Sequence, residues 1–124
     1  MKQPAVHRYG DSRERPIDEG CLVRELSNSG DDPGLSIAEA RVPPGVTTRW
    51  HRLRGVAERY LVQRGSGRAE IGDAPPVTLL PGDVVCIPPG CRQRISNTGE
   101  GDLQFLALCT PRFTPDCYED LEDG

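Results

Sequence analysis

Three polar side chains, His51, Glu58 and Gln93, are of types that could act together on one ligand. Alternation along a β-strand places every second side chain on the same face. Burying polar groups among apolar walls costs several kcal/mol unless each group has a partner. We therefore expect a bound ion, a ligand or a mutual hydrogen-bond network at this face. The predicted inward-facing series are Thr47, Arg49, His51 and Leu53, then Glu58, Tyr60 and Val62, then Cys91, Gln93 and Ile95.

The trio predicts either a metal site or a metal-free network. Imidazole and carboxylate ligands suit iron, manganese, nickel or zinc, and the side-chain oxygen of Gln93 is a weaker ligand for these ions. A three-ligand site of His51, Glu58 and Gln93 would leave positions open for water or substrate. In the metal-free alternative, the amide of Gln93 donates to Glu58, and no cofactor is needed.

Two further residues extend the predicted site. Tyr60 shares the face of Glu58, so both are candidates to shuttle protons in catalysis, although a buried tyrosine more often packs in a core with its hydroxyl satisfied. Arg49 is a candidate to hold an anionic substrate together with Gln93, and the alternative is a rim arginine in salt bridges. Trp50, Arg92 and Arg94 are expected to point to the opposite face.

Short strands separated by turn residues must position these side chains. About nine apolar or alternating segments recur at near-regular spacing, and each is bounded by glycine, proline, serine, aspartate or asparagine. No long amphipathic helical stretch precedes the C-terminal tail. The pattern predicts an all-β fold, either a sandwich or a small barrel. The expected strands are 21–26, 35–42, 46–54, 56–63, 68–71, 77–80, 84–87, 91–96 and 102–109.

Composition argues against several classes of function. The 124 residues are about one domain. A formal net charge of −4 and a pI of about 5.1 argue against nucleic-acid binding, which favours a basic face. The sequence has no apolar run of membrane-spanning length and no apolar leader at its start. Five cysteines without a Cys-x-x-Cys pair are typical of free thiols in a reduced, cytoplasmic protein.

Glycine and proline residues frame the candidate residues in two segments. The first extends from Gly45 to Gly65 and contains His51, Leu53 and Glu58, and the second extends from Gly82 through Pro88-Pro89-Gly90 to Asn97 and contains Gln93. Together these frames resemble the two sequence motifs of the cupin family over roughly residues 35–110. The resemblance implies a small antiparallel jelly-roll β-barrel, the double-stranded β-helix.

The resemblance also implies a ligand set that this chain lacks in part. Cupins usually supply two histidines and a glutamate from the first motif and a third histidine from the second. His51 matches the first histidine and Glu58 the glutamate, whereas Leu53 and Gln93 stand at the other two histidine positions. The family implies a small-molecule ligand, a homodimer, and one divalent transition metal (iron, manganese, nickel or zinc), or none where ligands are lost.

Two functions remain open at this point. One is a metal-dependent small-molecule enzyme resembling cupin isomerases, including those acting on sugar phosphates, or dioxygenases. The other is a non-catalytic cupin that binds or senses a small molecule, with or without metal. The predicted organisation is a flexible polar arm over 1–19, a single barrel domain over 20–110 and an acidic tail over 111–124.

Overall fold

The computed structural model describes residues 1–122, in which the regular structure is almost entirely β-strand. Two short 3-10 helices, η1 (Tyr9–Asp11) and η2 (Pro115–Cys117), are the helical elements of these residues, and neither is long and apolar enough to cross a membrane. The strands are β1 (Glu14–Pro16), β2 (Leu22–Ser27), β3 (Ser36–Val42), β4 (His51–Leu53), β5 (Ala57–Arg64), β6 (Gly67–Ile71), β7 (Val77–Leu79), β8 (Val84–Ile87), β9 (Gln93–Asn97), β10 (Leu103–Thr110) and β11 (Tyr118–Asp120).

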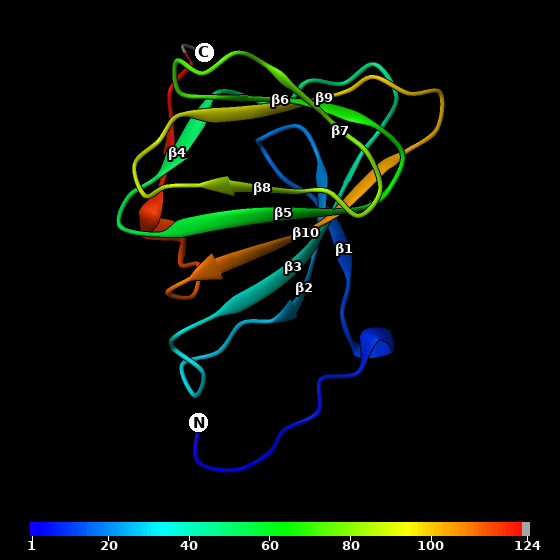
Figure 1. Ribbon diagram of the computed structural model, residues 1–124. Helices are drawn as coiled ribbons and strands as arrows, with labels where there is room; N and C mark the ends of the chain where they lie inside the picture. Colours follow the sequence, from blue (N-terminus) through cyan, green and yellow to red (C-terminus); the bar gives the residue numbers. More distant parts are fainter. Residues whose placement is uncertain (123–124) are drawn as a thin grey trace.

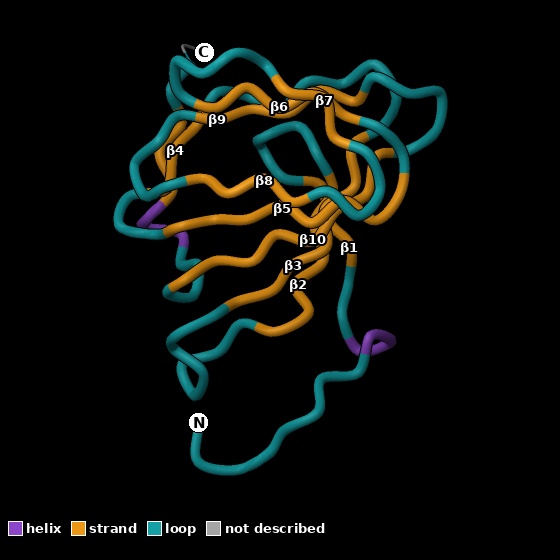
Figure 2. The backbone as a smooth tube through the Cα atoms, in the orientation of Figure 1, coloured by secondary structure: helices purple, strands orange, loops and turns teal. Residues whose placement is uncertain are grey.

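The strands form two antiparallel sheets that face each other (Figures 1 and 2). The larger sheet has the order β1-β2-β3-β10-β5-β8, and the smaller sheet has the order β11-β4-β9-β6-β7. The predicted all-β, antiparallel jelly-roll barrel is confirmed by this arrangement. Figure 1 also shows the turn between β1 and β2 reaching into the space between the two sheets.

Alternating burial along the strands builds the core. In β5 the inward residues are Glu58, Tyr60 and Val62, as the sequence predicts, and in β9 they include Gln93 and Ile95. Such a pattern follows from the two-residue period of a strand that has one face against the core. The main apolar cluster consists of Cys21, Ala40, Val42, Tyr60, Val62, Ala69, Leu79, Ile87, Ile95, Leu103 and Phe105.

The predicted alternation is wrong just before β4. Thr48 is buried instead of Thr47, and the backbone over 48–50 is irregular, so that β4 begins at His51. Two hydrogen bonds explain the change of register: the backbone N–H of Thr48 donates to the carbonyl of Ile95, and the Thr48 hydroxyl accepts from the N–H of Ile95 at 3.0 Å. The sequence series therefore holds only from His51 onward.

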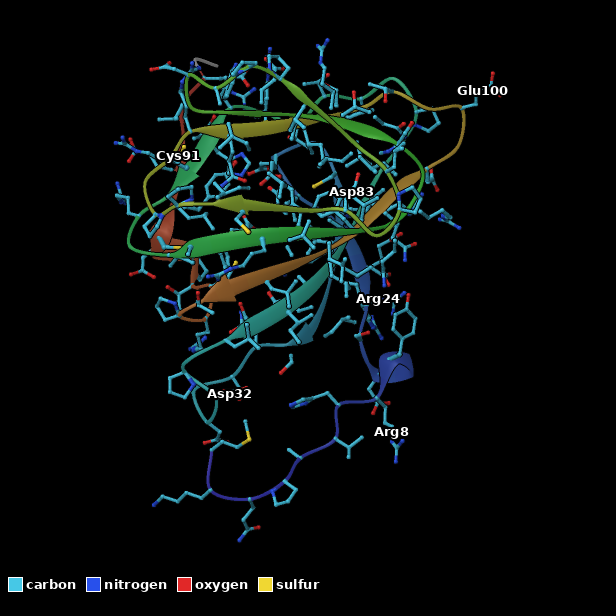
Figure 3. The ribbon with its side chains drawn as sticks, viewed as in Figure 1. Arg8, Arg24, Asp32, Asp83, Cys91 and Glu100 are labelled. Carbon is cyan, nitrogen blue, oxygen red and sulfur yellow. The ribbon has the colours of Figure 1, made fainter. Side chains whose placement is uncertain are left out.

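Both ends of the chain contribute strands to the sheets. The predicted arm over 1–19 contains β1, which pairs with β2, and the predicted tail over 111–124 contains β11, which pairs with β4. The part of the arm before η1 extends away from the barrel, and Arg8 is labelled on it in Figure 3. Segments from both ends thus lie beside the candidate site.

Candidate functional site

A cavity of about 340 Å³ lies between the sheets and contains the candidate groups. Its walls are mainly apolar, and its polar groups include His51, Glu58 and Tyr60, three of the residues predicted from sequence. The other lining residues come from β1, the turn between β1 and β2, β2 and the residue after it, β3, β4, β10 and the C-terminal segment. A concave apolar site with a few convergent polar groups is the usual form of a small-molecule site. Its apolar walls include Ile17, Val23, Ile37, Ala38, Ala40, Phe105 and Ala107.

His51 is fixed on three sides. Its Nδ1 lies 2.8 Å from the backbone carbonyl of Arg49, and its ring stacks on Tyr118 with centroids 5.2 Å apart. Its Nε2 lies 3.4 Å from Oε1 of Glu19. Burial lowers the pKa of His51, which favours the neutral ring. Since a carbonyl only accepts hydrogen bonds, Nδ1 carries the proton of the neutral ring and Nε2 presents its lone pair.

Glu58 is a buried carboxyl group with one free oxygen. Its Oε2 accepts a weak hydrogen bond from the thiol of Cys109 at 3.6 Å, while Oε1 has no hydrogen-bond partner within residues 1–122. The pKa of Glu58 is raised to about 7, mainly by burial and also by the charge of Glu19, whereas His51, Gln93 and Cys109 act in the opposite direction. A buried polar atom without a partner is unusual and indicates a position that a ligand can satisfy.

Gln93 and Tyr60 are paired with each other. The Tyr60 hydroxyl donates to Oε1 of Gln93 at 2.6 Å, and both side chains are buried. Burial raises the pKa of Tyr60 well above its usual range, so the phenol stays protonated. Oε1 of Gln93, which the sequence predicts as a ligand for a metal or a substrate, thus already accepts a hydrogen bond from Tyr60. Gln93 is not among the residues that line the cavity.

Glu19 is a site residue that the sequence interpretation missed. It lies in the turn between β1 and β2, and burial raises its pKa to about 7, with the thiol of Cys21 acting in the opposite direction. The sequence places Glu19 in the polar arm, because nothing local distinguishes it from its charged neighbours. One feature could have indicated it: Gly20 follows it directly, and a positive φ of 106° there makes the tight turn that precedes the first strong strand.

Arg49 is not brought to the cavity. Its guanidinium lies 3.1 Å from Asp120 on β11, so it has the rim position that the sequence left open as an alternative. Arg15 is the arginine that lines the cavity, at its exposed edge, and it lies 3.4 Å from Glu25. The deep part of the cavity therefore holds two carboxyl groups, whereas its arginine is near solvent and already paired.

The residues present do not fit the metal that the family resemblance implies. Leu53 is apolar and packs with Val56, Cys109 and Cys117, and Gln93 already accepts the Tyr60 proton. Within residues 1–122, no three His, Cys, Asp or Glu side chains are grouped so that they could hold one ion. Of the ligands predicted from the sequence, His51 and Glu58 remain as donors, fewer than the three protein ligands of an open catalytic metal site.

The opposite face of the smaller sheet carries the outward residues predicted from sequence. Arg92 and Arg94 place their guanidinium groups over the ring of Trp50, each 4.5 Å from its centroid. Arg94 also pairs with Glu70 on β6 at 2.9 Å. Such stacking is worth about 0.5–1 kcal/mol at exposed positions. The contacts of Trp50 with Arg92 and Arg94 thus link the residue before β4 to the start of β9.

Comparison with known proteins agrees with this architecture. The family model described as "Cupin domain" matches residues 38–109, which contain both glycine frames. An uncharacterized protein of Methanocaldococcus jannaschii, MJ1618, is 31% identical over 106 residues, which are 84% of each chain.

Solved structures show the same fold at low sequence identity. KdgF from Halomonas sp. superposes with a TM-score of 0.76 at 16% identity, covering 88% of this chain and 96% of its own. The nucleoside dehydratase Pac13 superposes at 0.80 with 15% identity, covering 97% of this chain and 92% of its own. Streptomyces PAC13 variants with a tyrosine or a histidine replaced were solved with uridine. Oxalate decarboxylase from Bacillus subtilis superposes at 0.79 with 22% identity, and this chain spans 33% of it.

Proposed function

Since this chain belongs to the cupin family, we propose that its barrel binds a small uncharged polar molecule and moves a proton on it without a bound metal. The observation that carries the proposal is the free Oε1 of Glu58 beside the cavity. Glu58 is the catalytic base or acid, and Tyr60 holds Gln93 in place beneath it.

The chemistry of Glu58 supports proton transfer. A carboxyl group with a pKa of about 7 exists in both protonation states near neutral pH, which is the condition for efficient general acid–base catalysis. A hydroxyl of the bound molecule would donate to the ionised carboxylate at Oε1, and a carbonyl would accept from the protonated one. Isomerisation, or loss of water from a hydroxy compound, requires this kind of transfer. Among the structural neighbours, the protein described as a nucleoside dehydratase gives the proposal support at the level of fold.

The charges of the cavity favour an uncharged molecule. A phosphate or carboxylate bound deep in the cavity would lie near Glu19 and Glu58 without a cation beside it. Arg15 is two-thirds exposed and already pairs with Glu25. The sugar-phosphate substrate considered from sequence is therefore disfavoured as an occupant of the inner cavity.

Deuterium exchange into bound candidates tests the proposal. Uridine and a panel of uncharged hydroxy and keto compounds are incubated with the protein in D₂O and followed by NMR. We expect at least one to bind and to exchange a C–H proton, and Glu58→Gln to bind it without exchange. Asp83→Asn, an exposed change on the turn before β8, is the control. Tight binding of phosphorylated compounds alone would contradict the proposal.

A second function is non-catalytic binding, as the sequence analysis left open. The occupied oxygen of Gln93 and the apolar Leu53 favour it, because both remove groups that catalytic relatives would use. In the same experiment, binding without exchange by the wild-type protein would identify this function instead.

A further inference from the structure

The turn between β1 and β2 forms a closed ring of contacts with His51. The backbone N–H of Arg49 donates to the carbonyl of Glu19 at 2.9 Å, and the carbonyl of Arg49 accepts from Nδ1 of His51 at 2.8 Å. Nε2 of the same imidazole then faces Oε1 of Glu19 at 3.4 Å. One residue, Arg49, thus fixes both partners through its own backbone, and the two side chains are held face to face.

The turn itself is held firmly in this position. The backbone N–H of Ile17 donates to the carbonyl of Cys21 at 3.0 Å, and that of Gly20 donates to the carbonyl of Ile17 at 3.1 Å. Cys21 is buried in the main core cluster. Glu19 therefore enters the space between the sheets on a short, anchored turn, and only 13% of its side chain is exposed.

The two nitrogens of His51 are both directed at protein groups. Nδ1 donates to a carbonyl, so the lone pair of Nε2 is the acceptor that faces the carboxyl group. A protonated Glu19 can donate a hydrogen bond to this lone pair. An ionised Glu19 would instead place a second acceptor opposite it, with no proton between the two atoms. Distances of this length between acid–base partners are common before a ligand binds, and they shorten in the complex.

We propose that Glu19 is a second acid–base residue of the site and that it shares one proton with Nε2 of His51. In the free protein the proton resides on Oε1 of Glu19 and points at the imidazole. When the C–O bond of a bound hydroxy compound breaks and the oxygen leaves with the electron pair, Glu19 gives its proton to that oxygen and becomes a carboxylate. The electron pair of the broken C–H bond forms the new C=C bond. Glu58 holds the proton taken from carbon, so the total charge of protein and ligand is unchanged. The role toward a ligand rests on the proposed function, whereas the shared proton does not.

Nitrogen-15 NMR of the histidine rings tests the pair without any ligand. The chain has two histidines, and His7→Asn assigns His51. We expect a neutral ring with its proton on Nδ1, and an Nε2 resonance displaced from that of a free lone pair. Glu19→Ala should return Nε2 to the free value. Glu19→Gln should retain part of the displacement, because an amide donates to Nε2. Asp83→Asn, an exposed change away from the cavity, should leave the spectrum unchanged.

Distinct results would overturn each proposal. Identical Nε2 resonances in the wild type, Glu19→Ala and Glu19→Gln would refute the shared proton, as would a ring proton on Nε2. If the spectra agree with the pair but no compound exchanges deuterium, the pair stands and the catalytic function fails. If wild-type exchange occurs and Glu19→Gln retains it in full, Glu58 acts without Glu19.

Discussion

The Tyr60 hydroxyl donates to the side-chain oxygen of Gln93 at 2.6 Å, and both side chains are buried. It links β5 of the larger sheet to β9 of the smaller one. Gln93 thereby has a structural partner at the position where the family resemblance implies a histidine.

Removing the Tyr60 hydroxyl should destabilise the protein without leaving a cavity in the core. In Tyr60→Phe the ring still packs on Phe105, 4.3 Å away between centroids, but the oxygen of Gln93 loses its donor. We expect a loss of about 1–3 kcal/mol in the free energy of unfolding, the cost of a buried unsatisfied group. Urea denaturation measures it. Tyr9→Phe is the control, since it removes an exposed bond to Glu39 and should cost less than about 0.5 kcal/mol.

Metal content should depend on Leu53 and Gln93. We expect protein purified without chelators to hold less than about a tenth of an equivalent of transition metal, and its thermal midpoint to be unchanged by EDTA. The double variant Leu53→His with Gln93→His supplies two imidazoles and should gain affinity for nickel or zinc. Elemental analysis and thermal shift check this. One equivalent of metal in the wild type, lost in His51→Ala, would contradict it.

The buried carboxyl groups should make stability fall as pH rises. Burial raises the pKa of Glu58 from 4.5 to about 7, so between these values the folded state binds more protons than the unfolded state. Its contribution is fully present below pH 4.5 and is lost as pH rises through 7, by up to about 3 kcal/mol. His51 acts oppositely below pH 6.5, because its pKa is lowered, and Glu19 acts in the same direction as Glu58.

Comparison with Glu58→Gln isolates this effect. The variant should be more stable relative to the wild type at pH 8 than at pH 5, since the glutamine does not ionise. Unfolding curves at both pH values measure the difference. An equal difference at the two pH values would show that Glu58 titrates normally.

Gly65 should tolerate no side chain. It has a φ of 82°, and an ideal Cβ there would lie 2.5 Å from the backbone carbonyl oxygen of Asp102. Gly65→Ala therefore combines an unfavourable backbone with a clash against rigid main chain, and we expect a loss of more than about 3 kcal/mol. Gly45→Ala is the matched control. It has a φ of 77° with open space, so about 1–2 kcal/mol is expected. Equal losses would show that the clash is relieved.

The sequence predicts this fold well because its evidence is local. Strand alternation places Glu58, Tyr60 and Val62 on one face, and the turn glycines Gly65 and Gly82 separate the strands. Both features depend on neighbouring residues only, so a single chain reveals them.

The site is predicted less completely because its remaining contacts are distant in sequence. Glu19 meets His51 across 32 positions, and Tyr118 stacks on it from β11. Neither has a local pattern that sets it apart from other polar or aromatic residues. Simple alternation predicts that Arg49 faces inward, but the irregular backbone before β4 turns it toward Asp120. Hydrogen bonds between separate segments decide these positions.

The stack of Arg92, Trp50 and Arg94 gives the protein an optical reporter of its own. Trp50 is the single tryptophan, and its surroundings depend on β4 lying beside β9. Its fluorescence therefore reports the unfolding of the smaller sheet, whereas far-ultraviolet circular dichroism reports the loss of strands in both sheets. If the two curves coincide during denaturation, the sheets unfold as one cooperative unit. If they separate, the wall that carries His51 opens independently of the wall that carries Glu58.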